Sequence, residues 1–173
     1  MTEGIVRRKK ILDILKKSGQ PVSGSRLSSE TGVSRQVIVQ DIALLRAGNE
    51  KIYATPKGYV LSSESGSKRV RRLFMVRHTR DEIKDELTTI IENGGKVLNI
   101  IIPHDVYGQL TADLIIESAE DIETFYSRLI NSRSGPLLQI SDGIHIHTVE
   151  AASNRILQNI ERDLREKGYL VQD

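Results

Sequence analysis

The first third of the chain has three segments in which apolar residues recur at the spacing of a helix face. These segments span residues 6–18, 23–31 and 34–47. Serine stands at the start of the second and the third, where its hydroxyl can cap the helix. Only Gly32 and Val33 separate these two, so they predict a helix, a tight turn and a second helix.

A hairpin is predicted directly after these helices. Residues 51–55 and 59–61 have the character of short strands, and a Pro-Lys-Gly run supplies the turn between them. Three helices followed by a hairpin are typical of a winged helix-turn-helix domain, in which the helix after the turn meets base edges in the major groove of DNA. The candidate DNA-binding residues on that helix and at the hairpin tip are Ser34, Arg35, Gln36, Gln40 and Lys57. A small helical fold with an ordinary solvated face is the alternative.

The rest of the chain alternates between strand and helix patterns. Strands are predicted over residues 69–77, 97–102, 110–116, 137–140 and 144–149. Helices are predicted over residues 79–93, 122–131 and 153–167. These elements indicate an α/β sandwich in which helices pack against a sheet, and they place the whole chain in the α+β class.

The net charge of +2 over 173 residues hides an asymmetry. Residues 1–66 hold 11 Lys and Arg against 6 Asp and Glu, a net +5, whereas residues 67–173 hold 14 against 17, a net −3. A serine-rich stretch of linker type lies at the join. We therefore expect a DNA-binding domain at 1–62, a linker at 63–68, and a second domain at 69–173 that contains all four histidines.

The composition excludes several classes of protein and site. The absence of cysteine excludes a disulfide scaffold, a thiolate nucleophile and a cysteine-based zinc site. No apolar run approaches the roughly 18 residues that span a bilayer, and the basic start lacks the apolar core of a signal peptide. We expect a cytoplasmic protein without a membrane segment, in which any transition-metal site is built from histidine and carboxylate side chains.

His145 and His147 are the most informative pair in the second domain. Side chains alternate along a strand, so both imidazoles emerge on one face, where they can chelate a metal ion. We expect Ile144 and Ile146 to face the opposite way, into a core. His78, at the end of another predicted strand, is a plausible third ligand. Two histidines exposed on a sheet surface are the alternative.

A carboxylate ligand is available one or two helical turns after His78, at Glu82 or Glu86. Three histidines and a carboxylate suit a divalent transition metal, and ligand type does not select among Ni, Zn, Fe, Co and Mn. In an enzyme the same cluster activates water, so a small metal-dependent hydrolase is one alternative function. No HExxH motif, phosphate loop or Ser-His-Asp order accompanies the cluster. A regulator that responds to the metal itself is another alternative.

The segment from Ser23 to Leu61 resembles the winged-helix domain of biotin-repressor-type regulators. The resemblance rests on three runs, namely Gly32-Val33-Ser34-Arg35, Asp41-Ile42-x-x-Leu45-Arg46 and Gly58-Tyr59. It implies DNA binding but no particular effector. A biotin ligase is excluded, because the remaining chain is short for that catalytic domain and has no glycine-rich, arginine-containing biotin-adenylate loop.

The segment from His78 to Ala151 resembles the three-histidine (3H) domain. The matching stretches include Ile83-Lys84-Asp85-Glu86-Leu87, Ile102-Pro103-His104-Asp105-Val106-Tyr107-Gly108 and Gly143-Ile144-His145-Ile146-His147-Thr148-Val149. One departure is Asp105, where the family commonly has proline. A 3H domain joined to this winged helix is similar to the niacin-responsive transcriptional repressors of bacteria.

This resemblance implies a site, an effector and a partner. The metal ligands would be His78, Glu86, His145 and His147. The effector would be nicotinate, acting as a corepressor of genes for niacin or NAD metabolism or uptake. The candidate effector-binding residues are His104, Tyr107 and Arg77, although His104 is alternatively a structural group in a loop. We expect a homodimer on operator DNA, because one short recognition helix reads too few bases for adequate specificity.

Overall fold

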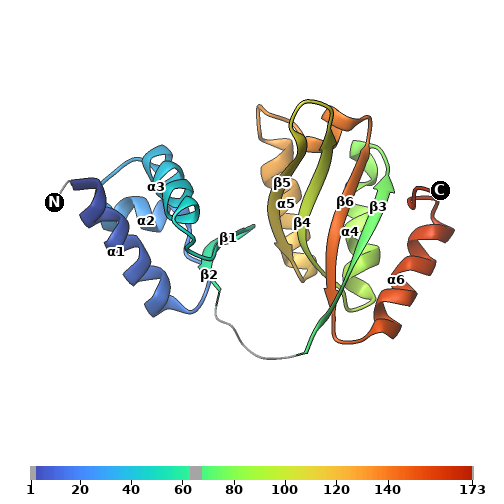
Figure 1. The fold of residues 1–173 in the computed structure, drawn as a ribbon. Coiled ribbons are helices and arrows are strands. Elements are labelled where there is room, and N and C mark those ends of the chain that lie inside the picture. The colour runs from blue at the N-terminus through green and yellow to red at the C-terminus, as the bar shows by residue number, and fades with distance from the viewer. Residues whose placement is uncertain (1–2, 63–67, 173) are drawn as a thin grey trace. The chain divides into compact units, whose positions relative to one another are not determined.

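A computed structural model describes residues 3–62 and 68–172 of the chain (Figure 1). The chain divides into two compact units, residues 1–66 and residues 67–173. The predicted linker lies outside the described residues except for its last residue, Lys68. No helix of the described residues is long and apolar enough to cross a membrane.

The N-terminal unit has three helices and a two-stranded antiparallel sheet. In chain order its elements are α1 (Glu3–Ser18), α2 (Gly24–Thr31), α3 (Arg35–Ala47), β1 (Ile52–Thr55) and β2 (Gly58–Leu61). Both predicted serine caps are present: Ser23 Oγ accepts from Arg26 N at 3.1 Å, and Ser34 Oγ accepts from Val37 N at 3.3 Å. The helices therefore begin where the sequence supplies a side-chain acceptor for the free N–H groups of the first turn.

Two contacts inside this unit hold α3 and the hairpin in place. Asp41 of α3 is buried and accepts hydrogen bonds from the guanidinium groups of Arg7 and Arg8 on α1. At the hairpin, Gly58 has φ +136°, and a Cβ built on it would lie 2.3 Å from Val22 O. Glycine is required there because the backbone before α2 passes directly over the turn.

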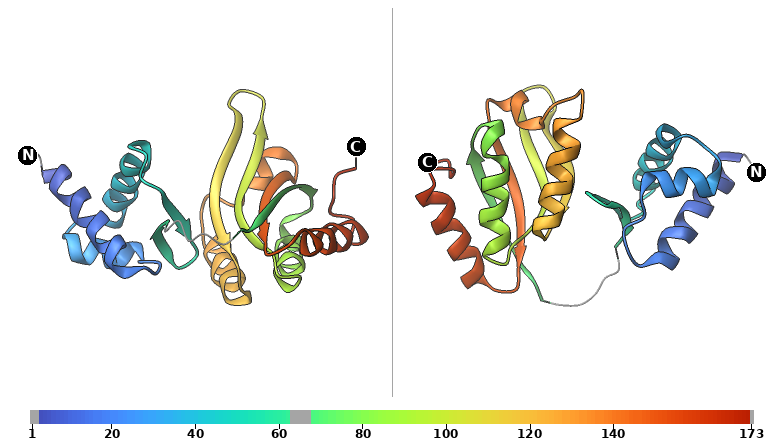
Figure 2. Two further views of the ribbon diagram at one scale, coloured as in Figure 1. Left: turned by 60° about the horizontal axis from the view of Figure 1, so that its bottom comes forward. Right: turned by 180° about the vertical axis from the view of Figure 1, so that it is seen from behind.

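The C-terminal unit is a four-stranded antiparallel sheet with helices on one face. Its elements are β3 (Val70–Arg77), a 3₁₀ turn (Arg80–Glu82), α4 (Ile83–Glu92), β4 (Lys96–His104), β5 (Gly108–Ile116), α5 (Ala119–Ile130), a second 3₁₀ turn η2 (Leu137–Ser141), β6 (Ile144–Ala151) and α6 (Asn154–Glu166). The strand order is β3-β6-β4-β5. Seen from behind, α4, α5 and α6 all lie on the same side of the sheet (Figure 2).

The main core of this unit lies between the sheet and these helices. Val76 and Val149 of the sheet pack with Leu87 of α4 and with Leu157 and Ile160 of α6 in one buried cluster. The opposite face of the sheet is covered by no described helix of this unit. The expected sandwich therefore has two layers, one of strands and one of helices.

Two predictions about this unit were wrong. Residues 137–140 do not form a strand; they belong to a 3₁₀ turn, in which Gln139 N donates to Pro136 O at 3.2 Å. The orientation of β6 is also the reverse of the expectation. Its histidines face the core with the helices, and Ile144 and Ile146 lie half-buried on the open face.

Candidate functional site

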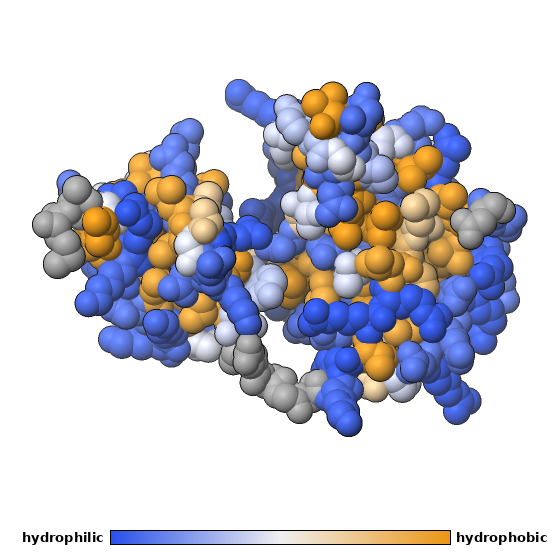
Figure 3. Space-filling view, viewed as in Figure 1, coloured by the Kyte–Doolittle hydropathy of each residue, from blue (hydrophilic) through white to orange (hydrophobic). Residues whose placement is uncertain are grey.

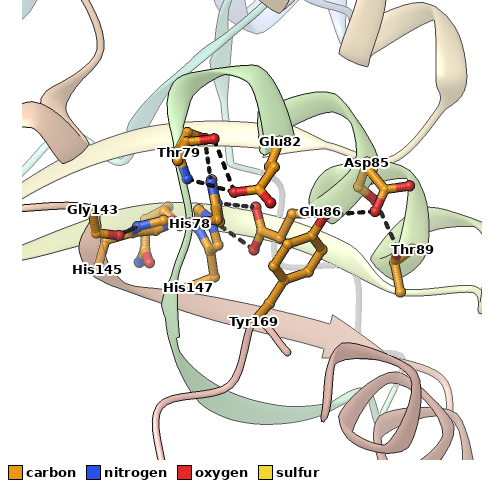
Figure 4. A network of polar contacts seen from close by, with 11 residues as sticks. His78, Thr79, Glu82, Asp85, Glu86, Thr89, Gly143, His145, His147 and Tyr169 are labelled. Atoms are coloured by element: carbon orange, nitrogen blue, oxygen red, sulfur yellow. Dashed lines mark hydrogen bonds and ion pairs between the residues drawn. The ribbon is translucent and has the colours of Figure 1, made fainter. Parts of the chain in front are cut away.

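Three histidines and one glutamate meet in the core of the C-terminal unit (Figure 4). His78 follows β3, Glu86 lies in the first turn of α4, and His145 and His147 lie on β6. Their meeting depends on strand pairing, because β3 lies beside β6 with Val76 opposite His145. All four side chains are buried, with at most 6% of any residue exposed. The alternative of histidines on an exposed sheet surface is therefore excluded.

The carboxylate of Glu86 lies between two of the imidazoles. His78 Nε2 is 3.3 Å from Glu86 Oε2, and His147 Nε2 is 3.4 Å from Glu86 Oε1. The His145 ring centroid is 4.8 Å from that of His78 and 4.7 Å from that of His147. Ligand atoms of His78, Glu86 and His145 all lie within 4.8 Å of one another.

Each of the three histidines has its outer ring nitrogen bonded to a backbone carbonyl. His78 Nδ1 lies 2.8 Å from Thr79 O, His145 Nδ1 lies 3.0 Å from Gly143 O, and His147 Nδ1 lies 2.7 Å from Asn99 O. A carbonyl oxygen only accepts, so each Nδ1 carries the hydrogen. In the neutral imidazoles the Nε2 lone pairs are then free for the centre of the cluster, which is the arrangement that orients histidine toward a metal.

The ionisation of the cluster is coupled. Burial raises the pKa of Glu86, but the three histidines lower it by more, so the carboxylate is ionised. Burial lowers the pKa of His145 to about 4, which leaves that imidazole neutral. Burial also opposes a charge on His78 and His147, yet the nearby Glu86 carboxylate raises the pKa of both above its usual value.

The cluster fits a cation. Glu86 Oε1 is buried, and its contact with His147 Nε2 at 3.4 Å does not have the geometry of a hydrogen bond, so this oxygen accepts none from the described residues. An unsatisfied carboxylate oxygen in a buried site is costly. A divalent transition metal would satisfy the carboxylate and would accept the lone pairs of His78 and His145, whose ligand atoms lie within 4.8 Å of each other and of the Glu86 carboxylate. Nitrogen and oxygen ligands of this kind suit several metals, so the donor set gives the class of ion rather than its identity.

Glu82, the other carboxylate considered, is engaged elsewhere. Its Oε2 accepts from Thr79 N at 2.8 Å and from Thr79 Oγ1 at 2.9 Å, so it belongs to a capping box at the start of the helical segment. The same hydrogen bonds lower the pKa of Glu82. Local helix-start chemistry therefore holds Glu82 beside Thr79, one turn before the carboxylate that reaches the imidazoles.

A cavity of about 210 Å³ adjoins the cluster. Its wall includes His78, Glu86, His145 and His147, and the rest of it is mostly apolar. The apolar part comes from the sheet, α4, α5 and η2, and includes Ile83, Leu87, Ile100, Ala112, Leu114, Phe125, Leu129, Leu137 and Leu138. No lysine or arginine is present among the described residues that line it.

The three residues predicted to bind an effector do not line this cavity. His104 Nδ1 accepts from the backbone N–H of Val106 at 3.1 Å and of Tyr107 at 3.2 Å, so it stabilises the turn between β4 and β5. Tyr107 is 72% exposed in that turn. Arg77 points away from the core, because it alternates with the buried Val76, and it pairs with Asp142 at 2.6 Å.

The predicted DNA-binding residues lie together at the start of α3, apart from Lys57. The Ser34 hydroxyl accepts the capping hydrogen bond of α3. Arg35, Gln36 and Gln40 are exposed on the first two turns of this helix. Lys57 is exposed at the hairpin turn, where its backbone N–H donates to Thr55 Oγ1 at 3.1 Å. This is the geometry in which a recognition helix and a wing can approach one duplex.

Several residues of the site were missed from the sequence. Phe125 and Leu129 lie within the helix predicted over residues 122–131 and Leu138 within the strand predicted over residues 137–140, and all three line the cavity. The carbonyl groups that bond the histidines were also not anticipated. The one available signal was Gly143 before the His-x-His pair, since it has φ +83° and a Cβ there would lie 2.6 Å from His78 O.

Comparisons with known proteins match both units. A 3H domain model matches residues 71–173, and an HTH domain model matches residues 7–60. A probable transcription repressor NiaR from Thermotoga maritima is 42% identical over 96% of this chain and 94% of its own length. The transcription repressor NadR from Bacillus subtilis is 34% identical over 98% of this chain and 96% of its own length. Both names describe repressors, and neither describes an enzyme.

Proposed function

This chain belongs to the 3H-domain family of transcription repressors, and on that premise we propose that it is a homodimer that binds operator DNA when its 3H domain holds a divalent metal and nicotinate. The observation that supports the metal is the set of three imidazoles whose Nδ1 atoms are engaged by backbone carbonyls. These rings surround a buried carboxylate with one unsatisfied oxygen.

The residues that hold the metal are His78, Glu86, His145 and His147. The metal supplies a Lewis acid to which a pyridine nitrogen or a carboxylate of the effector can bind. The protein's own contribution is to fix each imidazole tautomer and to keep the carboxylate ionised in a dry site.

The cavity beside the cluster supports a small aromatic acid as the effector. Its apolar wall, which includes Phe125, Leu129 and Leu138, can receive a single flat ring. Because the described lining residues include no lysine or arginine, the metal is the positive charge available to a carboxylate in this cavity. Nicotinate combines such a ring with a carboxylate, which is why we place it here rather than at His104, Tyr107 and Arg77.

The N-terminal unit supplies the DNA contacts. Arg35, Gln36 and Gln40 are exposed on α3 and have the side chains that pair with guanine and adenine edges, while Lys57 in the wing can meet phosphate. Two copies are needed so that two recognition helices read half-sites one turn or several turns apart. A repressor of this kind acts in the cytoplasm, on genes of niacin or NAD metabolism or uptake.

DNA binding with and without nicotinate tests the proposal. Operator sequences would be selected from a random duplex pool by metal-loaded protein with nicotinate, and fluorescence anisotropy would then measure their affinity. We expect nicotinate to tighten binding by at least about tenfold, a coupling free energy of about 1.4 kcal/mol. Nicotinamide, which lacks the carboxylate, is the matched control ligand and should have a smaller effect.

The variants separate the parts of this function. His147→Ala should lose metal and the response to nicotinate, whereas Arg35→Ala should keep both metal and nicotinate binding and lose operator affinity. Operator binding that ignores nicotinate but follows the metal concentration would instead identify a metal-responsive regulator. No dependence on either would refute the proposal.

A further inference from the structure

The open face of the C-terminal sheet has an apolar centre. Leu73 and Met75 of β3 are 62% and 44% exposed on this face. Ile101 of β4 and Ile144 and Ile146 of β6 are half-buried beside them. Met75 lies opposite Ile146, and Ile146 lies opposite Ile101, so these side chains form a continuous row across three strands. We call these five residues the open-face patch; Figure 3 shows hydrophobic side chains gathered over this part of the sheet.

A charged row borders the patch at one end of the strands. Arg71 of β3 lies opposite Glu150 of β6, and Glu150 lies opposite Lys96 of β4. Ion pairs join Arg71 to Glu150 at 2.8 Å and Lys96 to Glu117 at 3.0 Å. Read across the sheet, the four charges alternate as positive, negative, positive and negative.

An apolar centre with a charged border is the anatomy of a protein interface. The order of the charges indicates which partner fits. A two-fold axis between two facing sheets, parallel to the strands, places β3 over β5 of the second copy and β6 over its β4. Arg71 then faces Glu117 of the partner subunit, and Glu150 faces Lys96 of the partner subunit. The two-fold axis reverses the order of the charged row in the second copy, so each positive charge faces a negative one. The surface is therefore complementary to itself, as an isologous dimer requires.

We propose that the open-face patch and its charged row are the dimer interface of this protein, with a second copy of the same chain as the occupant. The inference rests on the proposed function in requiring two copies, and it adds the surface through which they associate. Sheets packed face to face in this way bury side chains of both inner faces between them. The patch is thereby removed from water, which is the driving force of the association.

Sedimentation of the full-length protein over a concentration series tests the surface. Met75→Glu places a charge at the centre of the patch, and we expect it to raise the dimer dissociation constant more than tenfold, because a buried charge without a partner is costly. Ile130→Glu is the matched control, since Ile130 is 48% exposed at the end of α5 on the other side of the sheet. It should sediment as the wild type does. Thermal unfolding and metal content would verify that both variants are folded.

A charge exchange tests the two-fold geometry itself. Arg71→Glu and Glu117→Arg each place like charges opposite one another in a homodimer, so each variant alone should dimerise more weakly than the wild type. An equimolar mixture restores opposite charges at both contacts and should recover dimerisation. Failure of the mixture to recover would refute the geometry.

Failure of the proposed interface and failure of the proposed function would give different results. A wild-type monomer, or a Met75→Glu dimer as tight as the wild type, would overturn the interface. The response of operator affinity to nicotinate is measured separately. A loss of dimerisation in Met75→Glu therefore supports the interface even where nicotinate has no effect.

Discussion

At the scale of single residues, hydrogen bonds to the backbone set the tautomer of each histidine in the cluster and the role of each nearby glutamate. The Nδ1 atoms of His78, His145 and His147 are held by the carbonyl groups of Thr79, Gly143 and Asn99, respectively, which turns each Nε2 toward the centre of the cluster. The two glutamates of the same segment differ for a similar reason. Glu82 binds the start of its own helical segment, and Glu86 faces the imidazoles.

Exchanging each glutamate for glutamine should separate these roles. Glu86→Gln removes the negative charge from the cluster, and we expect metal affinity to fall at least about tenfold. Glu82→Gln should leave metal affinity near that of the wild type and cost about 1 kcal/mol or less of stability, since it weakens only a capping box. Titration with Zn²⁺ or Ni²⁺ and urea unfolding would measure the two effects. Equal losses of metal affinity would contradict the assignment.

Metal binding should also depend on pH in a definite direction. The Glu86 carboxylate raises the pKa of His78 and His147, so protons compete with the metal at these nitrogens. We expect affinity to be highest in mildly alkaline solution and to fall as the pH falls through the raised pKa values.

Calorimetry in buffers of different ionisation enthalpy would count the protons released on metal binding. We expect that number to rise as the pH falls from about 8 to about 6, because more of the two imidazoles are then protonated. Glu86→Gln is the control, since it removes the cause of the raised pKa and should reduce the release. An affinity that is unchanged over this range would disagree with the cluster as described.

At the scale of elements, β6 contributes to both proposed sites. One face of this strand carries the histidines of the metal cluster, and the other face carries residues of the open-face patch. His145 and His147 face the helices and the cavity, and Ile144 and Ile146 face the open side. The turn before this strand sets where it begins. Asp142 has φ +53° and Gly143 has φ +83°, and Gly143 lies against the backbone of His78.

Gly143→Ala should therefore disturb the metal site through the backbone. The added Cβ would lie 2.6 Å from His78 O, so the backbone that positions His78 must shift to make room. We expect a lower melting temperature and a loss of metal affinity. Gly168→Ala is the matched control, because Gly168 also has a positive φ, +77°, but a Cβ there has nothing within 4 Å. It should lose some stability and keep its metal affinity.

At the scale of the whole molecule, the two units divide the work of a repressor. The unit of residues 1–66 presents α3 and the wing, and the unit of residues 67–173 contains the cluster and the cavity. Each unit has its own buried hydrophobic cluster. We propose that the signal of the effector reaches the DNA-binding unit through a dimer whose geometry depends on the effector.

Metal removal should weaken the dimer. His145 and His147 share β6 with the patch residues Ile144 and Ile146. Release of a metal from the histidines would therefore loosen the strand that carries these two residues of the proposed interface. We expect chelation to raise the dimer dissociation constant several-fold in sedimentation experiments, and re-addition of metal to restore it. A dissociation constant that does not change when elemental analysis shows the metal to be lost would separate the cluster from dimerisation.

The helices, the winged helix-turn-helix order and the pairing of His145 with His147 on one strand face were all determined by the sequence. These features depend on hydrophobic periodicity and helix capping, and residues close in the sequence determine both. Periodicity shows that side chains alternate on β6, but it does not show which face is covered, because both faces carry residues that can be buried. The resemblance to the 3H domain had already named Glu86 rather than Glu82, whereas the tertiary structure alone decided that the histidines face inward and that a cavity adjoins them. These features depend on strand order and on helices distant in sequence, whose contacts no local pattern records.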